Sequence, residues 1–427
     1  MAALRLTIIP ALLFSIVMLF ILVLAPQALA EERYVTDGMW GTGGSSSGQF
    51  NMPMGITIDS TGNVFVADVG NHRIQKFSSS GALITMWGTH GYGNGQFDGM
   101  WGVEVDESGN VYVADSMNNA RIQKFDSSYV YSKQWGSFGS GDGQFSNPVD
   151  AVVDSHGNVY VTDMSNNRIE KFGPDGGFLA KWGTPGSGDG QFNSPHGLAV
   201  DSNDNIYVAD TGNHRIQKFD SEGAFIIKLG SYGDSADGQF SNPQGVTVDS
   251  AGNIYVADTG NHRIQKFDSA GSFITKWGSY GSAPGQLHTP IDVAVKSDGE
   301  VYVSELWTHR VQKFRKALCG MPQLELRVEK RFWKNYDEYL EGWLTISYIV
   351  HNASGSEAFD SVITGSTATN GVTLVTSLPA SLGNIAPDGS WTGKVQYDVP
   401  PDVERFVATT FASAKDACGV SYSYPAP

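Results

Sequence analysis

The segment Ala209–Phe219, ADTGNHRIQKF, carries an aspartate, an asparagine, a histidine and an arginine within six consecutive positions. These are residue types from which catalytic and metal-binding sites are built. The same eleven residues recur unchanged at Ala257–Phe267. A catalytic centre is needed only once, whereas a residue that is copied between units most simply serves each unit. The repetition therefore indicates a structural role, in which the aspartate and the arginine form hydrogen bonds within or between neighbouring units.

The arginine of this motif marks the period of an internal repeat. It recurs at intervals of 47 or 48 residues, at Arg73, Arg121, Arg168, Arg215, Arg263 and Arg310. Each unit contains four short segments rich in valine, isoleucine, tyrosine and phenylalanine, separated by turns that contain glycine, and no unit shows the 3.6-residue periodicity of a helix. Four strands in a repeat of roughly 45 residues predict one blade of a β-propeller, so six units predict six blades.

The two ends of the repeat region predict how the ring closes. The sixth unit ends after Phe314 without a fourth strand. The segment that begins at Arg33, RYVTDGMWGTGGSSSGQF, matches the missing strand and the loop that follows it. We therefore expect residues 33–316 to form an all-β, six-bladed propeller in which the N-terminal strand completes the last blade and removes the exposed sheet edges.

Three recurring patterns give the units a family resemblance: PxG(I/V/L) at the start, then GN(V/I)YVAD and NxRIQKF. In these patterns the units resemble NHL repeats, a family of six-bladed propellers. The resemblance implies binding functions for many members, including sensor domains outside cells, and RNA binding for some intracellular members. Related six-bladed propellers include a zinc- and calcium-dependent lyase and metal-dependent lactonases, in which histidines and acidic residues that do not repeat bind metal at the channel mouth.

Positions at which the units differ are the candidates for a specific site. The position after the blade-opening proline, or after its equivalent Met100 in the second unit, lies at the start of the innermost strand, at the expected channel mouth. It is occupied by Met54, Trp101, Val149, His196, Gln244 and Ile291. The next position is glycine in four units but Asp150 and Asp292 in the third and the sixth, which lie opposite each other in a six-fold ring.

Further candidates surround this mouth. Glu104 adds a third acid, and the loops between blades add His90, Phe138, Tyr232 and Tyr280. Together these residues predict a ligand-binding mouth with facing carboxylates and aromatic walls, and neutral variation on a tolerant surface is the alternative.

No metal ion or cofactor is expected from the sequence. No spacing of cysteine and histidine indicates structural zinc. The oxygen-rich segment DSNDN, Asp201–Asn205, lacks the length and the closing glutamate of a calcium loop, and it lies in a turn that every unit has. We therefore interpret it as a turn.

Both ends of the chain carry signals outside the repeats. Residues 1–30 contain an apolar run from Leu6 to Leu24 and a small-residue pattern, ALA, which predict either a cleaved signal peptide or a retained membrane anchor. In both cases the remainder is exported and is secreted, periplasmic or on the cell surface. Residues 319–427 contain six to eight strand-like segments and predict a β-sandwich that resembles Ig-like accessory domains. Cys319 and Cys418 are expected to close it with a disulfide, and free thiols are the alternative.

The charge of the chain narrows its possible partners. A net charge of −16 repels phosphate backbones, which argues against nucleic acid. We expect a non-catalytic binding scaffold for a protein, peptide or glycan on the face with the long loops, and membrane attachment only through residues 6–24. The alternative is a metal-dependent enzyme of the lyase or lactonase type with its site at the channel mouth, but fold alone does not confer chemistry.

Overall fold

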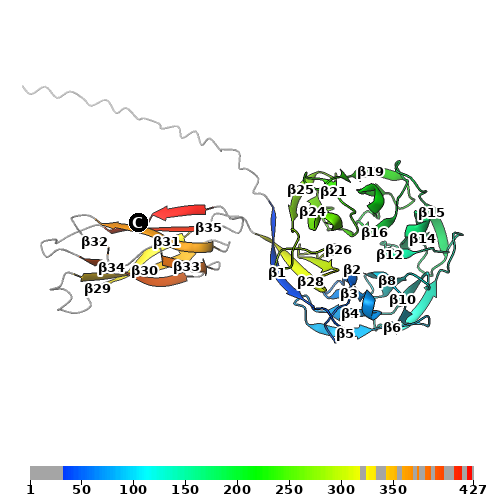
Figure 1. Ribbon diagram of the computed structural model, residues 1–427, viewed down its shortest axis with the longest axis horizontal. Coiled ribbons are helices and arrows are strands. Elements are labelled where there is room, and N and C mark those ends of the chain that lie inside the picture. The colour runs from blue at the N-terminus through cyan, green and yellow to red at the C-terminus, as the bar shows by residue number, and fades with distance from the viewer. Residues whose placement is uncertain are drawn as a thin grey trace, which may run out of the picture. The chain divides into compact units, whose positions relative to one another are not determined.

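The computed structural model describes residues 32–317 throughout, together with strands between residues 324 and 425. Within residues 33–317, six four-stranded antiparallel sheets surround a central channel (Figure 1), which confirms the six-bladed β-propeller. The predicted signal or anchor and both cysteines lie outside the described residues. In the part of the chain that is described, no helix is long and apolar enough to span a membrane.

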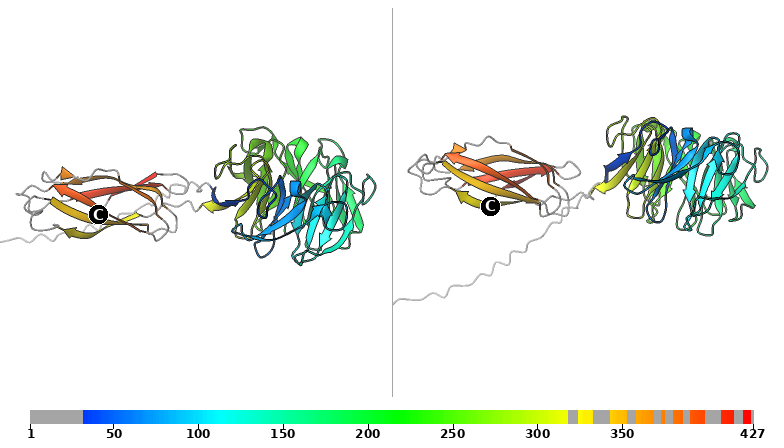
Figure 2. Two further views of the ribbon diagram at one scale, coloured as in Figure 1. Left: turned by 60° about the horizontal axis from the view of Figure 1, so that its bottom comes forward. Right: turned by 90° about the horizontal axis from the view of Figure 1, so that it is seen from below.

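Each of the first five blades consists of four strands that follow one another in sequence and are ordered from the channel outward (Figure 1). Figure 2 shows the blades from the side. Their strands are β2 (Pro53–Ile58), β3 (Val64–Asp68), β4 (Arg73–Phe77) and β5 (Leu83–Trp87); β8 (Met100–Val105), β9 (Val111–Asp115), β10 (Arg121–Phe125) and β11 (Tyr131–Trp135); β12 (Pro148–Val153), β13 (Val159–Asp163), β14 (Arg168–Phe172) and β15 (Phe178–Trp182); β16 (Pro195–Val200), β17 (Ile206–Asp210), β18 (Arg215–Phe219) and β19 (Phe225–Leu229); β22 (Val246–Val248), β23 (Ile254–Asp258), β24 (Arg263–Phe267) and β25 (Phe273–Trp277).

The sixth blade joins the two ends of the propeller. It consists of β26 (Pro290–Val295), β27 (Val301–Glu305), β28 (Arg310–Ala317) and, outermost, β1 (Arg33–Trp40). Strand β1 pairs with β28 along its whole length, from Arg33 opposite Ala317 to Trp40 opposite Val311. Closure by the N-terminal strand is therefore confirmed.

Short elements lie in the loops between strands. Two-residue parallel pairs stabilise two of the long connections between blades, and single turns of 3₁₀ helix follow the second strand of four blades. These elements are β6 (Thr89–His90) with β7 (Gln96–Phe97), β20 (Ser231–Tyr232) with β21 (Gln239–Phe240), and η1 (Val69–Asn71), η2 (Met164–Asn166), η3 (Thr211–Asn213) and η4 (Thr259–Asn261).

Burial follows the position of a strand in its blade. The second strand is buried at every residue, whereas the outermost strand alternates between exposed and half-buried residues, as in β15. The core between blades is filled by the phenylalanine of each GQF segment. Phe50, for example, is fully buried, and its ring lies 5.5 Å from that of Phe77. This residue packs in one core cluster with residues of the first and sixth blades, so it fills the space between these two blades.

The strands described beyond residue 317 form two four-stranded antiparallel sheets. One contains β29 (Leu324–Phe332), β30 (Trp343–Asn352), β34 (Ser390–Asp398) and β32 (Thr373–Leu374). The other contains β33 (Ala380–Ile385), β31 (Ala358–Ala368), β35 (Ala408–Lys415) and β36 (Ser421–Pro425). Their assembly into an Ig-like sandwich stays a prediction.

The acidic residue and the arginine of the repeated motif form a buried ion pair in every blade, with an aspartate in the first five blades and Glu305 in the sixth. In the first blade, Arg73 Nε donates to Asp68 Oδ2 at 2.7 Å, and its terminal nitrogens donate to three carbonyls of the long loop at residues 45–49. Gln75 donates to the same carboxylate and the same loop. Equivalent carboxylate–arginine pairs at 2.6–3.0 Å occur in the other blades, as Asp115–Arg121, Asp163–Arg168, Asp210–Arg215, Asp258–Arg263 and Glu305–Arg310.

The histidine of the motif is also a structural residue in three blades. It adopts a left-handed backbone conformation, with φ 55° at His214, and this directs its ring toward the next blade. Its Nδ1 atom then accepts a hydrogen bond from a backbone N–H of that blade. These bonds join His214 to Asn242 (3.0 Å), His262 to Thr289 (3.1 Å) and His309 to Met52 (3.1 Å). The structural interpretation of the motif is therefore confirmed for these blades.

The segment DSNDN is a turn, as predicted. Asp201 Oδ1 accepts hydrogen bonds from the backbone N–H groups of Asn203 and Asn205, and its other oxygen lies 3.0 Å from Lys218 Nζ. Asp204 has a φ of 58° at the position where the first blade has Gly62, with a φ of 85°. An aspartate tolerates this left-handed conformation, which explains why the glycine of the turn is absent here.

One blade departs from the repeated network. Glu170 occupies the position at which the other five blades carry glutamine. A carboxylate cannot donate the two hydrogen bonds that Gln75 makes to its aspartate and its loop. Glu170 is fully buried and lies 3.1 Å from Arg168. Burial raises its pKa to about 7, and the charge of Asp163 adds to this effect while Arg168 opposes it.

We predict that Glu170→Gln stabilises the propeller. The pKa of the folded state, about 7, exceeds the usual 4.5, so the native state binds this proton more tightly and loses stability as pH rises from about 4.5 through about 7. The amide restores the two donors, so the free energy of unfolding should increase by about 1–3 kcal/mol at pH 8 and by less at pH 5. Urea unfolding at both pH values measures this difference.

The matched control places the same carboxylate in a blade that has glutamine. Gln217 makes the amide contacts in the fourth blade, so Gln217→Glu should lower the free energy of unfolding at pH 8. Equal stability of the Glu170→Gln variant and the wild type at pH 8 would contradict the prediction.

Candidate functional site

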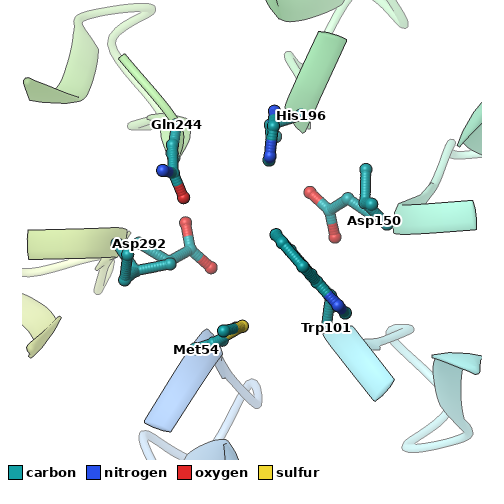
Figure 3. Close-up of a pocket in the computed structure, with 12 residues that line it drawn as sticks. Met54, Trp101, Asp150, His196, Gln244 and Asp292 are labelled. Atoms are coloured by element: carbon teal, nitrogen blue, oxygen red, sulfur yellow. The ribbon is translucent and has the colours of Figure 1, made fainter. Parts of the chain in front are cut away.

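The six blade-opening side chains meet at one pocket in the channel. Each stands at the start of the innermost strand of its blade, so the ring of blades brings all six together. Figure 3 shows four of them, Met54, Trp101, His196 and Gln244, with the facing aspartates Asp150 and Asp292. The pocket has a cavity volume of about 30 Å³, and the residue after each blade-opening residue in the sequence also lines it. The residues that line it include Met54, Trp101, Val149, Asp150, His196, Gln244, Ile291 and Asp292.

The walls of this pocket combine apolar side chains with an indole and an imidazole. Met54, Val149 and Ile291 are buried apolar residues. Trp101 extends into the centre, and its ring lies 5.5 Å from the His196 ring at an interplanar angle of 47°. The pocket is therefore narrowed by an indole and an imidazole that come from non-adjacent blades.

The imidazole of His196 is held by its own loop. Its Nδ1 atom lies 3.1 Å from the carbonyl oxygen of Ser194, which requires a proton on Nδ1 if the bond is made. Burial lowers the pKa of His196. A neutral ring protonated on Nδ1 leaves Nε2 as an acceptor.

The two facing aspartates tie neighbouring blades together. Asp150 Oδ2 accepts from the backbone N–H of Leu198 in the fourth blade at 2.8 Å, and Asp292 Oδ2 accepts from that of Ile56 in the first blade at 2.9 Å. Each carboxylate also accepts from the backbone N–H of the residue that follows it. These side chains therefore contribute to the propeller itself as well as to the pocket wall.

Glycines of the preceding blades make room for these carboxylates. A Cβ atom on Gly102 would lie 2.3 Å from Asp150 Oδ1, and one on Gly245 would lie 2.3 Å from Asp292 Oδ1. The order glycine, glycine, aspartate thus occurs twice around the ring. The channel has a two-fold pattern of side chains on a six-fold backbone.

Glu104 lies deeper than the sequence prediction placed it. It lines a second cavity of about 200 Å³ that it shares with Asp150 and Asp292, beyond the blade-opening residues. Thr57 Oγ1 donates to Glu104 Oε2 at 2.8 Å. Glu104 comes three residues after Trp101 along β8, and the pairing of β8 with β9 has a register shift between Met100 and Val103. The Glu104 side chain lines this second cavity of the channel.

Neither lysine nor arginine is among the residues that line the two cavities, and His196, whose pKa is lowered by burial, is the one basic side chain there. Burial raises the pKa of Glu104 to about 7 and that of Asp292 to about 7. Burial and the charge of Asp292 raise the pKa of Asp150 well above its usual value. Protons are therefore shared among these acids near neutral pH.

The structure does not bring the loop aromatics to the pocket. Phe138, Tyr232 and Tyr280 are 72%, 72% and 64% exposed and do not line either channel cavity. Instead, the ring of Tyr232 lies 4.7 Å from that of His214 in the same blade, and the ring of Tyr280 lies 5.0 Å from that of His262. The structure therefore does not place these three aromatic residues in the walls of the mouth, and two of them pack against the motif histidine of their own blade instead.

The repeat family is decided by comparison with known proteins. The NHL repeat matches at residues 50–77, 145–172, 192–219, 240–267 and 287–314. The chain is an NHL-repeat protein. The second blade of this NHL propeller is not among the matched segments, and it is the blade that has Ala120 in place of the motif histidine or asparagine.

Solved structures share the fold of the NHL propeller at low sequence identity. A protein of unknown function from Bacteroides thetaiotaomicron is 18% identical, over 67% of this chain and 76% of its own, with a TM-score of 0.54. A gluconolactonase from Xanthomonas campestris is 16% identical, over 67% and 91%, with a TM-score of 0.50. Virginiamycin B lyase from Staphylococcus aureus is 14% identical, over 67% and 99%, with a TM-score of 0.47. No curated protein matches the sequence.

We predict that Glu104→Gln raises the melting temperature of the NHL propeller more at pH 8 than at pH 5. The pKa of Glu104 in the folded state, about 7, exceeds the usual 4.5, so ionisation of this group destabilises the native state as pH rises through that interval. The amide still accepts from Thr57 and removes one of three repelling charges. The gain at pH 8 should correspond to about 1–3 kcal/mol.

Melting curves recorded by circular dichroism at both pH values measure this effect. Glu107→Gln, at an exposed glutamate of the adjacent turn, is the control for loss of one negative charge. A gain from Glu104→Gln that is the same at both pH values would contradict the assignment of the repulsion to the channel acids.

Proposed function

We propose that this protein is an exported binding scaffold whose long-loop face binds a macromolecular partner, namely a protein or a peptide. In every blade this face carries both the long connections between blades and the short loops that hold the repeated motif. The bonds from Arg73 to the carbonyls at residues 45–49 join one loop of each kind. The proposed binding surface is therefore a rigid ring of loops.

The observation that carries the proposal is the exposure of large apolar side chains in these loops. Phe138, Tyr232 and Tyr280 stand at equivalent positions in three blades and are among the most exposed large apolar residues of the described chain. Large aromatic residues and methionine are enriched in protein–protein interfaces. Other exposed residues of the same loops are Tyr92, Met117 and Trp307.

The distribution of these residues favours a large partner. They come from different blades, so only a ligand that spans several blades can contact more than one or two of them. The pocket at the channel mouth, by contrast, has a cavity volume of only about 30 Å³. Localisation outside the cytoplasm rests on the predicted signal or anchor in residues 1–30.

The enzyme alternative requires a set of metal ligands at the channel mouth. Among the described residues, the mouth offers the single imidazole of His196, and both facing aspartates accept backbone hydrogen bonds. The groups of three close potential metal ligands in the described part of the chain lie outside the channel. The arrangement therefore favours the scaffold.

We predict that the triple substitution Phe138→Ser, Tyr232→Ser and Tyr280→Ser weakens binding of peptides selected from a random displayed library. The full chain serves as bait in the selection, and fluorescence anisotropy gives the Kd of each selected peptide. Loss of aromatic contacts should raise the Kd by about tenfold or more, because truncation of a central interface residue typically costs at least about 1–2 kcal/mol.

Two variants separate the loop face from other surfaces. Ile84→Ser, Leu179→Ser and Ile226→Ser together remove three apolar side chains that are 43–55% exposed on the outermost strands, and peptide binding should not change. Trp101→Ala with His196→Ala tests the channel mouth. Selected peptides that bind the loop triple variant as tightly as the wild type, or binding confined to a glycan array, would contradict the proposal.

A further inference from the structure

A histidine–histidine–aspartate cluster lies at the junction of the first and second blades, outside the channel. His72 follows η1, His90 belongs to β6, and Asp98 follows β7. One potential ligand atom from each residue lies within 4.8 Å of the other two. His90 Nε2 is 3.5 Å from Asp98 Oδ1, and the rings of His72 and His90 are 4.5 Å apart.

These distances are close to those of a metal site. Two ligand atoms that each lie about 2.0–2.1 Å from a tetrahedral ion are about 3.3 Å apart. The His90–Asp98 pair has nearly this separation already. The side chain of His90 is 60% exposed, so its ring can move the short distance that remains, whereas the Asp98 side chain is 12% exposed and provides a fixed ligand.

The hydrogen bonding of His72 differs from that of the other motif histidines. In His214, His262 and His309, Nδ1 accepts a backbone N–H, so the proton of the neutral ring must be on Nε2 and neither nitrogen is free to bind a metal ion. His72 Nδ1 is buried and has no hydrogen-bond partner among the described residues. The tautomer of His72 is therefore not fixed, and this ring keeps a lone pair for a ligand.

Equivalent positions in the other blades carry no such set. The position of His90 is occupied by Gly43, Phe138, Pro185, Tyr232 and Tyr280, and that of Asp98 by Asn51, Ser146, Asn193, Ser241 and His288. The backbone of this junction is thus shared by all blades, while its three ligating side chains occur together only between the first two. These alternative residues also show which substitutions the fold accepts.

We propose that His72, His90 and Asp98 bind a divalent transition-metal ion, of which zinc is the best match. Two imidazoles and one carboxylate are a ligand set that zinc uses in proteins, and water can complete the coordination. Asn118 Nδ2 donates to Asp98 Oδ2 at 2.7 Å and so orients the Oδ1 atom toward His90. The site opens to solvent through His90, which gives the ion an entry path.

Isothermal titration of the metal-stripped full chain with zinc chloride tests this site. The variants His90→Tyr, Asp98→Asn and His72→Asn each introduce a residue that another blade carries at the same position. Each should bind one zinc ion fewer per chain than the wild type, or bind it at least about 100-fold more weakly. Zinc should raise the melting temperature of the wild type and not that of these variants.

A second cluster supplies the matched control. Asp154, His156 and Asp204 also approach one another, but both carboxylate oxygens of Asp154 already accept two hydrogen bonds each, whereas Asn118 occupies only Oδ2 of Asp98. His156→Ala should therefore leave the zinc stoichiometry and affinity unchanged. Equal zinc binding by His90→Tyr, Asp98→Asn and the wild type, or a wild type that binds no zinc, would overturn the proposal, and melting curves of the metal-free variants establish that they are folded.

Discussion

The buried carboxylate–arginine pair in each blade is the interaction on which the rest of the propeller depends. In the first blade, Arg73 joins the end of β3 to the loop that precedes the blade, and Asp68 receives further bonds from Asn51 and Gln75. Loss of one partner of a buried ion pair costs about 3–5 kcal/mol because the remaining charge is uncompensated. Here the surrounding donors and acceptors satisfy both ions, so the pair fixes the long loop and thereby the whole loop face.

This repeated scaffold lets individual junctions differ without loss of the fold. At the channel, Asp150 connects the third and fourth blades and Asp292 connects the sixth and first. Both fit only because Gly102 and Gly245 lack a Cβ atom. The position after the blade-opening residue therefore has two roles. Where it is glycine it lines the channel, and where it is aspartate its side chain also bonds to the next blade.

The sequence predicts those features that follow from its period. The interval of 47 or 48 residues between motif arginines predicts the blades. The sixth unit lacks a fourth strand, and this absence predicts closure of the ring by Arg33–Trp40. It also predicts that the blade-opening residues meet, since each begins an innermost strand. It fails for Phe138 and Tyr232 because loop conformation, not strand order, decides where a loop side chain lies. The sequence also does not show whether a motif histidine makes its hydrogen bond, so it does not predict the cluster of His72, His90 and Asp98.

Three residues depart from the repeated pattern, and they differ in what can compensate for a missing hydrogen bond or for charge repulsion. Glu170 leaves a carboxyl without the donors of a glutamine, but it is fully buried and no ligand can reach it. Glu104 faces other acids inside the channel, and a proton relieves the repulsion there. His72 also lacks the hydrogen bond of its counterparts, yet it lies beside an exposed imidazole and a fixed carboxylate that can share a cation with it. A polar group that is left unsatisfied in an otherwise repeated network indicates function only where a ligand has access. By this criterion the junction of the first two blades, rather than the fully buried Glu170, is the departure that a bound ion explains.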